Sequence, residues 1–200
     1  MRAVAKVYLY LLNMKEKLKA LSAAWSNPGF RFLLSFFLLF MIFYSFNIFY
    51  IGVTSPGGLY VPFLDEHLNY IKWWRTSLLE SSAAIIRLFD YDLYTTPVRL
   101  HVDGYGGIVL VYSCLGYGIM SVFAAFVLAW PNRPWKSKLL FLIIGLIIIQ
   151  LLNIGRLIGL SLLGRDFPFY HSIDHHTVFN IVVYIVLIVM VYFWLKKPEV

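Results

Sequence analysis

The stretch LLFLIIGLIIIQLLNIGRLIGLSLL, residues Leu139–Leu163, is apolar almost throughout and contains a single charged side chain, Arg156. An apolar run of roughly 20 residues is long enough to cross a bilayer as a helix. The stretch therefore predicts a membrane protein. A charged side chain inside a span costs several kcal/mol on insertion scales and faces protein or water rather than lipid. We therefore expect Arg156 to serve a function.

The composition agrees with this prediction. The chain has 200 residues, of which 60% are hydrophobic and 14% are charged, whereas an ordinary soluble domain is about half apolar and a quarter charged. Two further runs, Phe32–Val53 and Thr177–Leu195, also predict membrane-spanning helices, and Gly106–Trp130 is a less uniform fourth candidate. The predicted fold is an all-α membrane protein with about four transmembrane helices, forming one integral membrane domain over 1–200.

Basic residues alternate between the connecting segments. Residues 1–31 contain six lysines and arginines against one acid, and 131–138 contain three basic residues and no acid, whereas 54–105 contain four basic and six acidic residues. The positive-inside rule places both termini and 131–138 in the cytoplasm. It places 54–105 on the extracytoplasmic side of the cell's inner membrane. Residues 1–30 read either as an amphipathic helix on the inner surface or as a solvated tail, and no cleavable signal peptide is evident. The net charge of +7 then indicates contact with anionic lipids and no nucleic acid.

The long extracytoplasmic segment, 54–105, is predicted to be structured. Leu64–Phe89 is rich in leucine, isoleucine and tryptophan and suggests one or two helices. Pro97–Val102 alternates like a strand, Asp103-Gly104 is a hairpin turn signal, and Ile108–Tyr112 is typical of a returning strand. This hairpin would deliver Cys114 to the start of a helix over Leu115–Trp130.

Three reactive side chains from different spans are predicted to lie at one depth. Arg156 lies about 18 residues beyond Lys138, roughly 27 Å along a helix, near the outer edge of a ~30 Å core. Cys114 is in the outer part of its span, and His176 begins the last span. An arginine beside a cysteine at a helix N-terminus favours the thiolate. Cys114 as nucleophile, Arg156 as oxyanion donor and His176 as proton carrier would suffice for acyl transfer.

Nearby polar residues are candidate supports. Asn153 shares a helical face with Arg156 and is predicted to hold the guanidinium, and Asn180 lies four residues after His176 on a polar stripe. Either His175 or His176 is the catalytic histidine, and the other is a loop residue or a supporting partner. The glycines that flank the candidate residues are expected to let backbones approach closely: Gly116, Gly118, Gly155 and Gly159.

With Cys114-Leu115-Gly116, Asn153-Ile154-Gly155-Arg156 and His176 in this order, the chain resembles the exosortase/archaeosortase family over roughly Val98–Tyr184. The resemblance implies a multi-span cysteine transpeptidase or protease that processes the C-terminal sorting tail of an exported protein. Such a tail consists of a short motif, a transmembrane helix and a basic cluster. Cys114, Arg156 and His176 match the family's Cys, Arg and His positions. Leu115 stands where the family motif has Ser, Asn180 stands where Gly is common, and the extra spans of longer members are missing.

Each residue also has a simpler explanation. Cys114 alone would be a packing residue, and Arg156 would extend to the outer headgroups. His171, Asp174, His175 and His176 suggest a metal site, but adjacent histidines do not easily aim both rings at one ion, so neither a metal nor a cofactor is predicted. Two other functions remain open: a membrane phosphatase or lipid-modifying enzyme in which Arg156 and the histidines bind phosphate, and a non-catalytic assembly or transport subunit in which Arg156 pairs with an acid of a partner.

Overall fold

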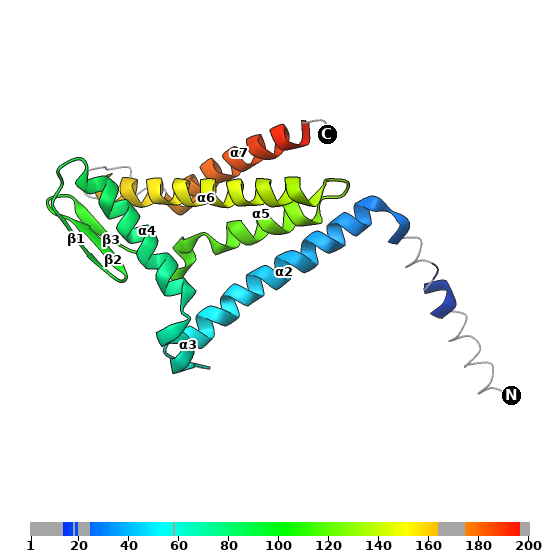
Figure 1. The fold of residues 1–200 in the computed structure, drawn as a ribbon, viewed down its shortest axis with the longest axis horizontal. Helices are drawn as coiled ribbons and strands as arrows, with labels where there is room; N and C mark the ends of the chain where they lie inside the picture. Colours follow the sequence, from blue (N-terminus) through cyan, green and yellow to red (C-terminus); the bar gives the residue numbers. More distant parts are fainter. Residues whose placement is uncertain (1–13, 18, 20–24, 58, 164–174, 197–200) are drawn as a thin grey trace.

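The computed structural model describes residues 14–17, 19, 25–57, 59–163 and 175–196, without the side chains of 163, 175, 176 and 178. Three long helices, α2 (Pro28–Thr54), α6 (Trp135–Leu163) and α7 (His175–Lys196), lie lengthwise with the shorter helix α5 (Tyr117–Ala129) (Figure 1). One end carries α3 (Pro62–His67), α4 (Tyr70–Arg87) and the strands β1 (Leu93–Thr96), β2 (Arg99–Val102) and β3 (Gly106–Val109). We call residues 62–109 the cap.

The structure confirms the all-α membrane class and the three uniform spans. In the part of the chain that it describes, three helices are long and apolar enough to cross a membrane: α2, α6 and most of α7. Of the predicted N-terminal segment 1–30, residues 14–17, 19, 25 and 26 are helical and 28–30 begin α2, whereas 1–13, 18 and 20–24 lie outside the described residues.

The fourth predicted span, Gly106–Trp130, is not one continuous helix. Its first residues form β3, the next form a 3-10 turn, and only 13 residues remain for α5. A helix of this length covers about 20 Å, which is less than the ~30 Å hydrocarbon core. The break occurs at Gly116, whose φ of 80° is a left-handed conformation that glycine adopts without a steric penalty.

The cap contains a three-stranded antiparallel sheet in the order β1-β2-β3. The predicted hairpin is confirmed, with Arg99 opposite Val109 and Val102 opposite Gly106, but the returning strand is Gly106–Val109 instead of Ile108–Tyr112. The strand β1, which was not predicted, pairs with the other edge of β2. Leu100 and Val102 of β2 are fully buried in one core with Leu79 of α4. The sheet is therefore held against α4.

Hydrogen bonds join the cap to α2. The hydroxyl of Tyr50 in α2 donates to the carbonyl of Leu68 at 2.7 Å, and the hydroxyl of Tyr70 in α4 donates to Asn47 Oδ1 at 3.0 Å. The hydrogen bond from Asn69, and to a smaller extent the one from Tyr60, holds the pKa of the Asp65 carboxyl below its usual range. These contacts order the chain between α2 and α4.

The helices α5, α6 and α7 form the rest of the bundle. Gly145 of α6 is so close to Phe123 of α5 that a Cβ on the glycine would overlap the ring. The rings of Phe141 in α6 and Trp194 in α7 stack with centroids 4.5 Å apart, and Trp194 Nε1 donates to Ser137 Oγ at 3.1 Å. The central position thus belongs to α6, which contacts α4, α5, α7 and the sheet.

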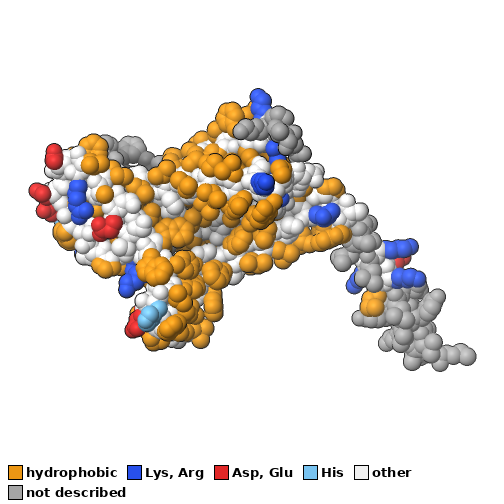
Figure 2. All heavy atoms as spheres, viewed as in Figure 1, with side chains coloured by type: hydrophobic (Ala, Val, Ile, Leu, Met, Phe, Trp, Pro, Cys, Tyr) orange, Lys and Arg blue, Asp and Glu red, His pale blue; other side chains and the backbone are white. Residues whose placement is uncertain are grey.

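Charged side chains gather at the two ends of the molecule, and hydrophobic side chains cover the helices between them (Figure 2). The acidic residues seen in this view lie mainly on the cap, which also carries some basic side chains, and most lysines and arginines lie toward the opposite end. We call that opposite end, with Arg31, Arg133, Lys136, Lys138 and Lys196, the basic end. This distribution is the one expected of a membrane protein with its basic end at the cytoplasmic face.

Candidate active site

Cys114 lies in a short 3-10 turn, η1 (Tyr112–Leu115), between the sheet and α5. Its amide donates to the carbonyl of Val111 at 2.9 Å, and Gly116 then turns the chain into α5. Cys114 is 8% exposed and lies among Leu79, Leu115 and Leu157. The cysteine therefore precedes α5 and is not at the N-terminus of that helix as the sequence analysis expected.

The side chain of Arg156 reaches Cys114 from the neighbouring helix α6. Its Nη2 atom donates to the sulfur at 3.7 Å. The guanidinium carbon also lies 4.8 Å from the centre of the Phe179 ring of α7, a cation–π contact. The half-buried guanidinium thus lies between the thiol of Cys114 and the ring of Phe179. The contact between Arg156 and Cys114 agrees with the common depth that we expected for them. A donor directed at sulfur stabilises negative charge there.

Asn153 is buried one helical turn before Arg156. It holds η1, which we call the cysteine turn, in place. Its side-chain amide donates to the main-chain carbonyl of Cys114 at 3.0 Å, and the residue is 1% exposed. Within the described part of the chain, its Oδ1 atom has no hydrogen-bond partner. Asn153 therefore positions the turn that contains Cys114 instead of the guanidinium of Arg156, which differs from our expectation.

A third polar residue of α6, Gln150, was missed. Its side-chain oxygen Oε1 accepts a 3.2 Å hydrogen bond from Trp74 Nε1 of α4. Its side-chain nitrogen Nε2 donates to the sulfur of Met120 in α5 at 3.0 Å. The sequence does contain a signal for it, because Gln150, Asn153 and Arg156 recur every three residues along one side of α6. Nothing local indicates Trp74, which comes from a distant segment.

A second arginine lies beside the cysteine turn. The guanidinium of Arg75 in α4 stacks over the Tyr112 ring at 5.2 Å, and the Tyr112 hydroxyl accepts a hydrogen bond from Ser55 at 3.2 Å. No sequence pattern pointed to these residues. They connect α4 and the residue that follows α2 to η1, so η1 is held from the side of the cap as well as from α6.

The remaining candidates lie on α7 or just before it. His175 and His176 form the start of α7, but their side chains lie outside the described residues, as do all of His171 and Asp174. Asn180, four residues after His176, is half-buried in α7. The contact between Arg156 and Phe179 brings the first turns of α7 toward Cys114.

Of the four glycines expected at close contacts, Gly116 and Gly118 have near neighbours. A Cβ on Gly116 would lie 3.7 Å from Gln150 Nε2 and 4.0 Å from Asn153 Nδ2. For Gly155 and Gly159, no atom of the described residues comes within 4 Å of a built Cβ. The distances at Gly116 are ordinary van der Waals distances, so this position near the cysteine favours glycine because of its φ of 80° and not because of a close approach.

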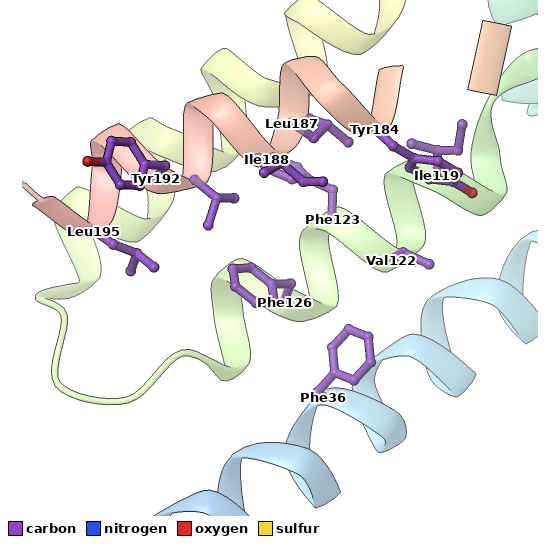
Figure 3. A pocket seen from close by; sticks show the side chains of 11 residues that line it. Phe36, Ile119, Val122, Phe123, Phe126, Tyr184, Leu187, Ile188, Tyr192 and Leu195 are labelled. Atoms are coloured by element: carbon purple, nitrogen blue, oxygen red, sulfur yellow. The ribbon is translucent and has the colours of Figure 1, made fainter. Parts of the chain in front are cut away.

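An apolar groove of about 530 Å³ opens between α2, α5 and α7 (Figure 3). Ile119 and Tyr184 lie at one end of it, and Phe126 and Leu195 lie toward the other. Ile119 follows Cys114 by five residues and Tyr184 follows Asn180 by four, so that end of the groove is the one nearest the cysteine turn. The groove continues from there along the apolar part of the bundle.

Comparison with known proteins adds a family to this geometry. The family model described as transmembrane exosortase (Exosortase_EpsH) matches residues 57–195, which include the cap, the cysteine turn, α6 and almost all of α7. No curated protein and no solved structure matches the chain. The matched region covers more than half of the sequence and contains Cys114, Arg156 and His176. The chain therefore belongs to the transmembrane exosortase family.

Proposed function

We propose that this protein is a membrane cysteine transpeptidase or protease that cleaves the C-terminal transmembrane sorting signal of an exported protein. The observation that carries the proposal is the 3.7 Å contact between Arg156 Nη2 and Cys114 Sγ. It puts a fixed positive donor against the only thiol of the chain. Family membership supports the general activity, and the contact supports the residues that perform it.

In the proposed reaction, the Cys114 thiolate attacks the carbonyl carbon of the scissile peptide bond. A carbon–sulfur bond forms, and the carbonyl electron pair moves to oxygen, where Arg156 stabilises the negative charge. The carbon–nitrogen bond then breaks, and the leaving amine takes a proton from His176. An acceptor amine or water attacks the resulting thioester, gives its proton to the histidine and releases the thiolate.

Asn153 and Gly116 position the backbone of Cys114 before the substrate binds. The hydrogen bond from Asn153 fixes the Cys114 carbonyl, and the left-handed turn at Gly116 directs η1 toward α6. Such positioning lowers the barrier because the thiolate and the oxyanion donor need no rearrangement when the substrate arrives. The partly buried hydrogen bonds of the Gln150 side chain keep the same region of α4, α5 and α6 together.

The apolar groove suits a substrate that enters from the side. Its walls come from α2, α5 and α7 and are almost entirely apolar, which matches a transmembrane helix. Its end at Ile119 and Tyr184 is the end nearest Cys114, so a helix in the groove would present the chain just outside the membrane to the thiol.

The decisive experiment compares the wild type with Cys114→Ala in cells that depend on this protein for tail processing. We expect the variant to insert normally but to leave the exported proteins with their C-terminal tails, as measured by intact-mass spectrometry. In the wild type, a thioester between Cys114 and a shortened exported protein should be trapped by rapid acid quenching. Normal processing by membranes that contain only Cys114→Ala would falsify the proposal.

A further inference from the structure

A polar cavity of about 360 Å³ lies at the basic end, between the start of α2 and the turn that joins α5 to α6. Its polar walls come from Arg31, Ser35, Asn132 and Lys138, and its apolar walls include Phe32 and Trp130. Cys114 lies beyond the other end of α5. The cavity is therefore separate from the candidate active site.

Among the described residues, two cations and no acid line this cavity. The Lys138 ammonium donates one hydrogen bond, to the carbonyl of Leu128 at 3.0 Å, which leaves two of its three N–H groups for a ligand. Arg31 is exposed, and among the described ranges no carboxylate forms an ion pair with either side chain. The N-terminus of α2 at Pro28 adds its positive dipole end. The cavity therefore attracts an anion.

The position of the cavity indicates where such an anion comes from. The spans α2 and α6 both begin at this end, so the cavity lies at the depth of the lipid headgroups. The rings of Phe32 and Trp130 meet edge to face with centroids 5.3 Å apart on its apolar side. Aromatic side chains at this depth contact the boundary between headgroups and acyl chains.

We propose that this cavity binds the phosphate group of an anionic membrane lipid. Arg31 and Lys138 donate to the phosphate oxygens, Ser35 and Asn132 offer polar contacts to the headgroup, and Phe32 and Trp130 contact the start of the acyl chains. A phosphatidylcholine headgroup fits less well because its trimethylammonium group is repelled by the two cations. A bound lipid in this place stabilises the junction between α2, α5 and α6.

The test uses the full chain, stripped of lipid in detergent and titrated with phosphatidylglycerol, phosphatidylcholine or inorganic phosphate under native mass spectrometry. We expect the first phosphatidylglycerol to bind at least tenfold more tightly than phosphatidylcholine, and millimolar inorganic phosphate not to displace it. Arg31→Gln and Lys138→Gln should each weaken that first site about tenfold, because each removes one charge-assisted hydrogen bond.

Lys136→Gln is the matched control, since Lys136 is exposed in the same turn of α6, does not line the cavity and changes the net charge equally. It should alter the affinity less than twofold. Arg31→Gln removes a side chain that points to no carboxylate of the described residues, so it reports on binding even if Lys138→Gln unfolds the turn. Equal affinities for Arg31→Gln and Lys136→Gln would overturn the proposal. Displacement of the lipid by inorganic phosphate would also overturn it, because the natural ligand would then be a soluble anion.

Discussion

The guanidinium of Arg156 donates to the sulfur of Cys114 at 3.7 Å, across 42 residues of sequence and from a different helix. The contact joins the 3-10 turn before α5 to the cap-facing part of α6. Asn153 makes a second connection between the same two segments through the Cys114 carbonyl. The thiol is therefore held from both its side chain and its backbone by residues of one helix.

Replacement of Arg156 should lower the rate of tail cleavage. Arg156→Gln removes the positive donor and should reduce kcat by about 10²–10³-fold, the usual cost of losing an oxyanion donor. Arg156→Lys keeps the charge but loses the planar fork and should fall between that variant and the wild type. Iodoacetamide labelling of Cys114 should slow in the same order. Arg99→Lys, at the exposed first residue of β2, is the control, and an unchanged cleavage rate in Arg156→Gln would remove Arg156 from the mechanism.

Loss of the Asn153 side chain should loosen the cysteine turn. Asn153→Ala removes a buried hydrogen bond to the Cys114 carbonyl and should cost about 1–3 kcal/mol of stability. Asn153→Asp has the same shape, but its carboxyl oxygen would face the carbonyl oxygen and should destabilise the protein more. Thermal unfolding in detergent measures the order wild type, Ala, Asp. Equal melting temperatures in all three proteins would show that the hydrogen bond contributes nothing.

Filling the apolar groove should hinder the substrate without changing the chemistry. Val122 lines the groove and is 41% exposed, so Val122→Trp places a large ring where a substrate helix would lie. We expect KM for a tailed substrate to rise several-fold while Cys114 labelling stays the same. Leu151→Trp is the matched control because Leu151 is 61% exposed on α6 and does not line the groove. The same KM in both variants would argue against docking there.

A methyl group at Gly145 should separate α5 from α6. Gly145→Ala would drive a Cβ into the Phe123 ring, and overpacking of this kind typically costs 1–3 kcal/mol, or roughly several degrees of melting temperature. At Gly52 of α2 no atom of the described residues lies within 4 Å of a built Cβ, so Gly52→Ala should be neutral or slightly stabilising. A melting temperature of Gly145→Ala no lower than that of Gly52→Ala would show that the packing of Phe123 against Gly145 leaves room for a methyl group.

Much of the arrangement follows from local properties of the sequence. The spans α2, α6 and α7 were predictable because crossing a bilayer requires only a long apolar segment. The β2–β3 hairpin was predictable from alternation and from Asp103-Gly104. The depth of Arg156, near that of Cys114, was also predictable, because the rise per residue of a helix is fixed.

Other features depend on contacts between distant segments. The strand β1 was missed because its four residues gain stability only by pairing with β2. The length of α5 depends on the turn at Gly116, which packs against Gln150 and Asn153 of α6. Trp74 and Phe179 carry no local signal of their roles, since each meets its partner only after α4 or α7 packs on α6.

The sequence by itself determined that this protein is a membrane protein, which of its residues are candidates for the chemistry and that Cys114 and Arg156 are expected at one depth. Only the tertiary structure decided that the guanidinium turns toward the sulfur and that Asn153 holds the cysteine backbone instead of the arginine. The reason is geometric. Depth depends on distance along one helix, whereas the direction of a hydrogen bond depends on the rotation of α6 and the path of the turn before α5. Packing against the cap, α5 and α7 sets both of these.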